Sequence, residues 1–269
     1  MNPPATDFLF RIADERRRRI DALRLATPPH VLRSRLVTRP GGRLERALRR
    51  HASDRPLGLV CEIKRASPSR GVLRPDLDPV LVASLYEAGG ATAISIVTEP
   101  DHFMGELEWM DQVRAVTRLP LLLKDFVVDG YQLLDAAVRG ADAVLLIAAL
   151  LGEVRLQRLV GEAKMLGLDP LVEVHDAEEL RIALRAGATL VGINNRDLRT
   201  LAVDPTVAPA LVRQVPPLVT AVAESGISTP ADLARLRATR CDAVLIGEVL
   251  MTSTDPAATL ATLVVAARG

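Results

Sequence analysis

The sequence has little cysteine, almost no net charge and no long apolar run, and each shortage argues against a class of protein. Only Cys61 and Cys241 are present among 269 residues, without a CxxC pair, which argues against a disulfide framework or a structural zinc site. The formal net charge of +1 provides no overall attraction to nucleic acid or to an anionic membrane. The segment Met1–Leu25 is rich in Arg, Asp and Glu, unlike a signal peptide, and no apolar run approaches the roughly 20 residues of a membrane span. We therefore expect a cytoplasmic protein with no nucleic-acid or membrane partner.

What the chain does have, from about residue 57 onward, is a regular alternation of two kinds of segment. Short runs rich in Val, Ile and Leu alternate with stretches whose apolar residues have helical spacing. The eight apolar runs are Leu57–Lys64, Ala93–Val97, Leu119–Phe126, Ala143–Ile147, Pro170–Val174, Leu190–Asn194, Val219–Ala223 and Ala243–Ile246. Their nearly continuous apolar content is typical of parallel strands that are buried on both faces. The helical stretches include Val80–Ala88, Tyr131–Val138, Leu156–Leu166, Glu178–Ala186 and Pro230–Ala238.

Eight such units predict an α/β fold, a closed (β/α)8 TIM barrel. The alternative is an open doubly wound sheet, but no GxGxxG motif opens a helix after the first strand. We predict a single barrel domain over residues 1–269, of which residues 1–56 are an N-terminal helical extension. Within it, Phe8–Leu23 and Leu44–Arg50 read as helices, interrupted at Pro40-Gly41-Gly42. The first helix either caps the barrel or contributes a lid over the active-site mouth.

Polar and charged residues stand at the ends of the predicted strands, where barrel enzymes place their active sites. Glu62 and Lys64 are two positions apart, so both point into the lumen, where an unpaired charge is costly. Later strand ends carry Lys124-Asp125-Phe126, Glu173, Asn194-Asn195-Arg196, Glu224-Ser225-Gly226 and Leu245-Ile246-Gly247-Glu248. Any one of these alone is equally explained by a structural ion pair. Lysines and glutamates that converge on one rim shift each other's pKa, and this predicts a functional site.

These strand ends together resemble those of the indole-3-glycerol phosphate synthase family. Six blocks in one order carry the resemblance: Glu62–Gly71, Leu123–Phe126, Pro170–Val174, Gly192–Leu198, Ala223–Ile227 and Leu245–Glu248. The resemblance implies a carboxy-lyase of tryptophan biosynthesis that closes the indole ring on 1-(2-carboxyphenylamino)-1-deoxyribulose 5-phosphate. It also implies a phosphorylated small-molecule substrate, no cofactor and no metal, and we expect a monomer. Cys61 and Glu106 depart from the family, which more often has small residues at both positions.

The resemblance also implies roles for individual residues. Lys124 is the general acid of ring closure, and Lys64 holds the substrate carboxylate and serves as an acid in dehydration. Glu173 acts as a base or stabilises a cationic amine intermediate, while Glu62 orients the lysines. Asn194 hydrogen-bonds a substrate hydroxyl or the leaving water. The choice of the final base stays open.

The remaining candidates are expected to bind the substrate. Phe126 forms an apolar wall for the anthranilate ring, Arg196 is either a supporting residue or a surface ion pair, and Glu224 orients Lys64 or Asn194. Barrels commonly bind phosphate where the last two strands end. The phosphate group is therefore placed near Ser67, Ser225, Gly226, Leu245, Gly247 and the backbone of Glu248. The histidines, His30, His51, His102 and His175, lack metal-ligand spacing, and we assign His175 a structural or surface place.

Three other functions remain as alternatives. A Schiff-base aldolase on the same barrel would use Lys124 or Lys64 as its nucleophile. A phosphoribosylanthranilate isomerase would share the phosphate site but needs a cysteine/aspartate pair, which the lysines and Glu62 fit poorly. A non-catalytic ligand-binding barrel would not need polar residues at every strand end.

Overall fold

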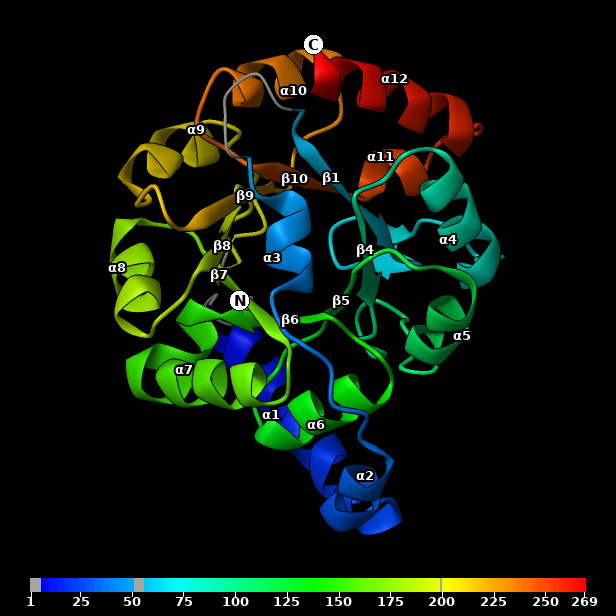
Figure 1. Cartoon of the computed structure of the whole chain (residues 1–269), viewed down its shortest axis with the longest axis vertical. Helices are drawn as coiled ribbons and strands as arrows, with labels where there is room; N and C mark the ends of the chain where they lie inside the picture. The colour runs from blue at the N-terminus through cyan, green and yellow to red at the C-terminus, as the bar shows by residue number, and fades with distance from the viewer. Residues whose placement is uncertain (1–5, 51–55, 199) are drawn as a thin grey trace.

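The eight apolar runs form the strands of a closed parallel barrel (Figure 1). The computed structural model describes residues 6–50, 56–198 and 200–269. The barrel strands are β1 (Gly58–Ile63), β4 (Ala93–Val97), β5 (Leu121–Lys124), β6 (Ala143–Ile147), β7 (Asp169–Val174), β8 (Leu190–Asn194), β9 (Thr220–Glu224) and β10 (Ala243–Ile246). Strand β1 pairs with β4 on one side and with β10 on the other, which closes the barrel. The predicted fold class is confirmed.

Helices surround the strands as the apolar spacing predicts. They are α4 (Pro79–Ala88), α5 (Trp109–Val116), α6 (Gly130–Val138), α7 (Ala148–Met165), α8 (Ala177–Arg185), α9 (Val207–Leu211), η1 (Val212–Gln214), α10 (Pro230–Arg237), α11 (Glu248–Met251) and α12 (Pro256–Arg268). Their starts follow ordinary capping chemistry: Thr229 and Asp232 form a capping box, with Pro230 at the first helical position. No helix in the described ranges is long and apolar enough to cross a membrane.

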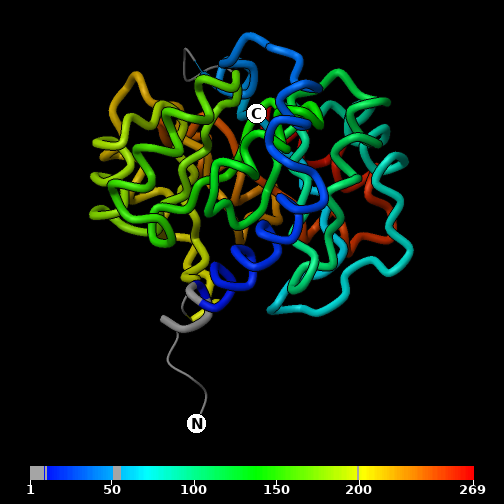
Figure 2. Tube along the Cα trace, turned by 90° about the horizontal axis from the view of Figure 1, so that it is seen from below, coloured from blue at the N-terminus to red at the C-terminus, as the bar shows by residue number. Residues whose placement is uncertain are grey.

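Three helices precede the barrel: α1 (Thr6–Ala26), α2 (Pro29–Arg35) and α3 (Arg43–Leu48). Helices α1 and α3 correspond to the predicted helices, whereas α2 was not predicted. Helix α3 covers the amino-terminal end of the barrel, where Asp169 accepts a hydrogen bond from the Glu45 N–H at 3.0 Å (Figure 1). Helix α1 runs along the outside of the barrel, packed against α6 and α7 (Figure 2). The division into one barrel domain with residues 1–56 as an extension stays a prediction.

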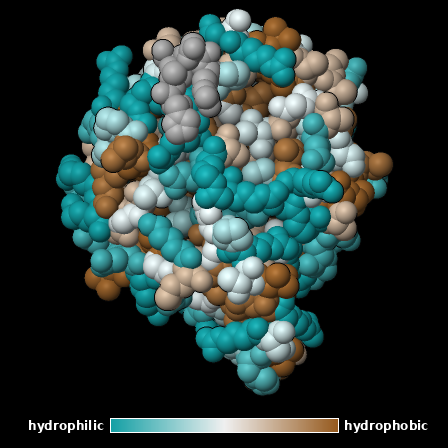
Figure 3. Space-filling model, in the orientation of Figure 1, coloured by the Kyte–Doolittle hydropathy of each residue, from teal (hydrophilic) through white to brown (hydrophobic). Residues whose placement is uncertain are grey.

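The apolar side chains of strands and helices form one continuous core, while charged residues dominate the surface. Figure 3 shows the face around α3 covered largely by hydrophilic residues, with apolar ones scattered between them. A short hairpin, β2 (Ala66–Ser67) with β3 (Gly71–Val72), follows β1 at the carboxyl end of the barrel. This hairpin belongs to the loops that surround the candidate site.

Candidate active site

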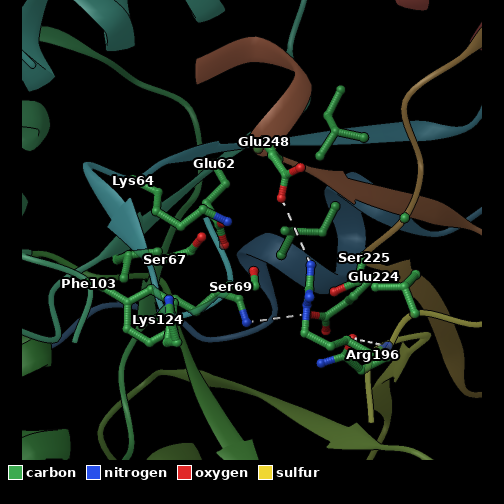
Figure 4. Close-up of a pocket in the computed structure, with 18 of the residues that line it drawn as sticks. Glu62, Lys64, Ser67, Ser69, Phe103, Lys124, Arg196, Glu224, Ser225 and Glu248 are labelled. Atoms are coloured by element: carbon green, nitrogen blue, oxygen red, sulfur yellow. Dashed lines mark hydrogen bonds and ion pairs between the residues drawn. The ribbon is translucent and has the colours of Figure 1, made fainter. Parts of the chain in front are cut away.

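A cavity of about 630 Å³ opens among the loops at the carboxyl ends of the strands (Figure 4). Every residue that the sequence predicts for the site lies in its lining. These are Glu62, Lys64, Ser67, Lys124, Phe126, Glu173, Asn194, Arg196, Glu224, Ser225, Gly226, Leu245, Gly247 and Glu248. No residue of α1 with a described position is part of this lining. The predicted roles of the lining residues stay predictions.

Four charged side chains from alternate strands form the floor of the cavity. They are Glu62 of β1, Lys124 of β5, Glu173 of β7 and Glu224 of β9. Alternate strands of a barrel contribute side chains to one layer, which in most barrels is filled by branched apolar residues. Here the layer holds one ammonium group among three carboxylates, so charged side chains replace the apolar ones of an ordinary barrel layer.

Lys124 lies at the centre of this layer. Its Nζ is 3.4 Å from Glu173 Oε2, to which it donates a hydrogen bond, and 3.4 Å from Glu224 Oε2. Burial favours the neutral amine, but the carboxylates of Glu224, Glu173 and Glu62 outweigh burial and raise the pKa of the lysine. Lys124 is therefore an ammonium group at neutral pH and a proton donor by default.

The pKa values of the two glutamates beside Lys124 are shifted in opposite directions. Burial, reinforced by the charge of Glu173, raises the pKa of Glu224 to about 7 despite the nearby ammonium. At Glu173 burial acts in the same direction, but Lys124 and His175 outweigh it and lower its pKa to about 2. Near neutral pH, Glu173 is thus a fixed anion and Glu224 is a group that can exchange a proton.

Two glycines leave room for the glutamates of this layer. A Cβ at Gly192 would lie 2.0 Å from Glu224 Oε1, and a Cβ at Gly247 would lie 2.8 Å from Glu62 Oε1. Both distances are shorter than side chains tolerate, so a larger residue at either position would displace a glutamate. Gly192 was not predicted as part of the site, although it lies two residues before Asn194 in β8 and therefore faces the same side of the strand.

Lys64 and Glu62 form a close pair at one side of the cavity. Lys64 Nζ lies 2.7 Å from Glu62 Oε1, and both side chains are largely buried. The i,i+2 spacing within β1 and its extension directs both into the lumen, as the sequence predicts. The lysine faces the open cavity, so its charge is available to an anionic group of a ligand (Figure 4).

Two arginines and one carboxylate lie at the rim of the cavity around the carboxyl end of β10. Glu248 Oε1 lies 3.0 Å from Arg70, and Glu248 Oε2 lies 3.9 Å from Arg196. Arg196 also donates a hydrogen bond to the Leu201 carbonyl at 3.0 Å, and its own N–H donates to Asn194 Oδ1 at 2.9 Å. Arg196 is thus not a plain surface ion pair, and Arg70 is a cation that the sequence interpretation missed.

The backbone after β9 turns sharply at Ser225 and Gly226, with φ of 65° and 68°. Asn195 holds this turn, because its Nδ2 donates to the Ser225 carbonyl at 2.9 Å while its Oδ1 accepts from Ala208 N. Successive residues in such a turn present backbone N–H groups to an anion. Ser67 faces the same cavity with a buried hydroxyl that has no hydrogen-bond partner among the described residues.

An aromatic wall lies beside Lys124. The rings of Phe103 and Phe126 are 6.2 Å apart between centroids, and both line the cavity. Phe103 belongs to the loop after β4, which Glu99 organises by accepting hydrogen bonds from the Asp101, His102 and Phe103 N–H groups. Phe103 was missed, since an isolated aromatic residue in a loop gives no periodic signal.

The two departures from the family pattern fit their surroundings. Glu106 pairs with Arg65 at 2.8 Å, and the Arg65 guanidinium lies 4.7 Å from the centroid of the Trp109 ring. Glu106 therefore connects the loop after β4 to the loop after β1. Cys61 is fully buried in the core, where burial raises the pKa of its thiol.

The structural or surface place that we predicted for His175 stays a prediction: the residue is largely buried and is not part of the cavity lining. Its ring lies against Glu173, with 3.4 Å between Nε2 and Oε1. His51 lies outside the described residues. The described part of the chain contains no cluster of three or more His, Cys, Asp or Glu side chains suited to a metal ion.

Comparisons with known proteins agree on one family. Residues 9–263 match the sequence model of the family described as indole-3-glycerol phosphate synthase. A protein of that name from Carboxydothermus hydrogenoformans is 42% identical over 261 residues, which cover 95% of this chain and 99% of the relative. One from Dehalococcoides mccartyi is 48% identical over 207 residues, covering 76% of this chain and 80% of the relative.

Solved structures support the fold alone. Thiamine phosphate pyrophosphorylase from Pyrococcus furiosus superposes with a TM-score of 0.59 at 20% identity, covering 80% of this chain and 98% of that chain. A mandelate oxidase mutant superposes with a TM-score of 0.60 at 18% identity, covering 79% of this chain and 73% of that chain. At such low identity the likeness shows a shared barrel architecture and carries no information about the reaction.

Proposed function

The chain belongs to the indole-3-glycerol phosphate synthase family, and from this membership we propose how the residues of its rim divide the work of the reaction. The enzyme converts 1-(2-carboxyphenylamino)-1-deoxyribulose 5-phosphate into indole-3-glycerol phosphate, carbon dioxide and water. The carboxylate-bearing ring carbon bonds to the ketose carbonyl carbon, and the carbonyl oxygen takes a proton. Loss of carbon dioxide restores the aromatic ring, and loss of the new hydroxyl as water completes the indole.

Lys124 is the proton donor to the carbonyl oxygen. The observation that carries this assignment is the buried ammonium group among three glutamates, which keep it protonated. Protonation of the oxygen as the carbon–carbon bond forms stabilises charge that exists only in the transition state. The same observation weighs against the Schiff-base aldolase, whose lysine must attack as a neutral amine.

We assign roles to the other charged groups from their pKa values and their positions in the cavity. Lys64, held by Glu62 at 2.7 Å, binds the substrate carboxylate and later assists the departure of the hydroxyl. Glu173, ionised across the neutral range, stabilises positive charge on the amine nitrogen. Glu224, with a pKa of about 7, takes up the last proton, because a base works best when its pKa is near the working pH. Asn194 hydrogen-bonds the departing hydroxyl.

The substrate's two ends are placed by the remaining lining. The anthranilate ring packs against Phe126 and Phe103. The phosphate group lies between the turn at Ser225 and Gly226 and the start of α11 at Gly247 and Glu248, with Leu245 beneath it. Arg196 supplies positive charge there, and the Ser67 hydroxyl adds a donor.

We further propose a cytoplasmic monomer in which residues 1–56 form an extension of a single barrel domain, with no nucleic-acid or membrane partner. The net charge of +1 supports the absence of an anionic macromolecular partner. Light scattering on the purified chain would test the monomer, and a single calorimetric unfolding transition would support the single domain.

Indole fluorescence tests the activity, and borohydride trapping tests whether a lysine forms a covalent adduct. The purified chain should form fluorescent indole-3-glycerol phosphate on addition of the carboxyphenylamino deoxyribulose phosphate, without any added cofactor. Borohydride added during turnover should trap no covalent adduct. A trapped adduct on Lys124 or Lys64 would replace this mechanism with the aldolase one.

A further inference from the structure

His175 is a buried titratable residue next to the reacting layer that the mechanism above does not use. It follows the last residue of β7, and its side chain is 14% exposed. Its Nδ1 lies 2.9 Å from Glu179 Oε2, and the same oxygen accepts a hydrogen bond from the His175 backbone N–H at 2.8 Å. Its Nε2 lies 3.4 Å from Glu173 Oε1. The imidazole ring therefore sits between two carboxylates from two different elements, β7 and α8.

Glu173 is held from two opposite sides by this arrangement. Its Oε2 faces the Lys124 ammonium at 3.4 Å, and its Oε1 faces the His175 ring at 3.4 Å. The Asn194 amide of β8 also helps to lower the pKa of this carboxylate. A carboxylate with a cation beside one oxygen can still rotate, whereas a cation close to each oxygen restricts both its plane and its distance from the lysine.

We propose that His175 is a positioning residue for the ring-closing reaction: as an imidazolium held by Glu179, it clamps Glu173 in the ionised form and orientation that face Lys124. This inference rests on the proposed function, because it assigns a purpose to the placement of Glu173. The positively charged ring needs a second carboxylate to remain charged when buried, and Glu179 supplies it.

The charges that face the ring account for its protonation. Burial favours neutral imidazole, but the hydrogen bond to Glu179 and the negative charges of Glu173 and Glu179 outweigh it and raise the pKa of His175 to about 10. The ring in turn helps to lower the pKa of Glu173. The charge of Glu173 in turn raises the pKa of the next glutamate along the layer, Glu224, so the two carboxylates titrate as a pair, and removal of the imidazolium should make this pair easier to protonate.

The protonation state can be measured without any activity assay. The chain has four histidines, so a heteronuclear NMR titration of the imidazole signals is tractable, with His175 assigned by its disappearance in His175→Gln or by elimination using the other three. We expect the His175 signal to stay that of an imidazolium up to at least about pH 8.5, about two units above an ordinary histidine. A midpoint near pH 6.5 would overturn the proposal, whatever the enzyme's activity.

Kinetics separate a positioning role from a merely structural one. His175→Leu removes both the charge and the donor, and we expect kcat to fall by about tenfold or more while KM changes by less than about threefold. The acid limb of the pH profile of kcat/KM should move up by about one unit, because the carboxylates lose a neighbouring cation. His175→Gln keeps a donor without the charge, so it should recover part of kcat and retain the shifted limb.

Two further variants complete the test. Glu179→Gln should lower the pKa of His175 in the NMR titration and shift the acid limb in the same direction as His175→Leu. His102→Gln is the matched control: His102 also pairs with a carboxylate, Glu15 at 2.9 Å, but outside the cavity lining, so its loss should leave kcat and the pH profile unchanged. An unshifted acid limb in folded His175→Leu would refute the clamp while leaving the ring-closing activity of the wild type intact; no indole from the wild type would instead refute the proposed function.

Discussion

Lys124 and the three glutamates around it form an electrostatic unit in which the proton affinity of each group depends on the others. The lysine stays protonated because carboxylates surround it, and Glu173 differs from Glu224 because it has a second cation, His175, beside it. A reaction in which the enzyme first donates a proton to the substrate and later removes one needs an acid and a base within a few ångströms of each other. The layer supplies them from residues whose ordinary side-chain pKa values suit neither task.

The first prediction at this scale concerns Lys124→Met. Loss of the proton donor should reduce kcat by about a hundredfold to ten-thousandfold, while product affinity stays within about tenfold, since the donor acts mainly in the transition state. Lys64→Ala should differ by weakening the binding of a carboxylated substrate analogue as well. Indole fluorescence gives kcat, and calorimetry gives both affinities. Near-native turnover in Lys124→Met would remove it from the role of acid.

The second prediction concerns the pH dependence of stability through Glu224. Its pKa is about 7 in the folded protein against an ordinary 4.5, so folded protein holds a proton that unfolded protein has released. Between pH 4.5 and 7 this group therefore lowers the free energy of unfolding as pH rises. Glu224→Gln should lose less stability than wild type between pH 5 and pH 8, as measured by denaturant unfolding at both values.

Two other groups set the background for that comparison and are shared by both proteins. His175, with its raised pKa of about 10, contributes stability that is complete below about pH 6.5 and is lost as pH rises toward 10. Glu173, with its lowered pKa, contributes stability that is lost only as pH falls from 4.5 toward 2. An identical pH dependence in wild type and Glu224→Gln would show that Glu224 does not titrate in this range.

The third prediction concerns Glu248, whose carboxylate lies close to Arg70 and Arg196 at the proposed phosphate site. This carboxylate competes with a phosphate group for both guanidinium groups. Glu248→Gln should therefore tighten the binding of a phosphorylated analogue by about twofold to tenfold, a modest effect because the site is open to solvent. Arg196→Gln should weaken it. The dephosphorylated analogue is the control, and an equal change for both analogues would place the phosphate elsewhere.

At the scale of elements, the barrel strands could be predicted because strands buried on both faces are continuous apolar runs. Helix α2 and the hairpin of β2 and β3 could not, since segments of seven and two residues are too short to show periodicity. The strand ends likewise indicated Glu173 and Lys124, because strand direction alone brings them to one rim. Phe103, Arg70 and the ring of His175 depend on how loops fold over that rim, and the pKa values depend on distances that no sequence pattern encodes.

The fourth prediction belongs to the amino-terminal ends of the strands. Asp142, just before β6, is buried and accepts hydrogen bonds from Arg43 at 2.9 Å, Arg114 at 3.0 Å and the Leu121 N–H at 2.9 Å. Asp142→Ala leaves buried donors without a partner and should cost about 3–5 kcal/mol of stability. Its kcat should be unchanged at temperatures where it is folded.

The matched control is Asp14→Ala on α1. Asp14 also pairs with an arginine, Arg17 at 2.5 Å, but its side chain is 63% exposed. Exposed pairs contribute little, so its loss should change stability by less than about 1 kcal/mol. A comparable loss of stability in both variants would mean that the buried position of Asp142 is not what makes it important.

At the scale of the whole molecule, stability and chemistry occupy opposite ends of the same strands. Buried carboxylates at the amino-terminal ends, Asp142, Asp169 and Asp242, are satisfied by backbone N–H groups and arginines. Those at the carboxyl ends are only partly satisfied: both oxygens of Glu224 and one of Glu62 lack a hydrogen-bond partner among the described residues. Unsatisfied buried charge is costly, so a ligand that satisfies it should stabilise the fold as a whole.

The last prediction follows from this separation. Product indole-3-glycerol phosphate at a concentration of about 100 times its Kd should stabilise the folded protein by about 2.7 kcal/mol, seen as a rise in Tm. Asp142→Ala should have a lower Tm without ligand but gain the same stabilisation, because the substitution lies at the far end of the barrel. Arg196→Gln should show the reverse, a Tm near that of wild type and a smaller gain at the same product concentration, because the product keeps the phosphate group that Arg196 faces in the proposed site. Scanning calorimetry of the three proteins, with and without product, measures both quantities. A ligand-induced gain that disappeared in Asp142→Ala would show that the two ends of the barrel are energetically coupled, and the separation of stability from chemistry would then be wrong.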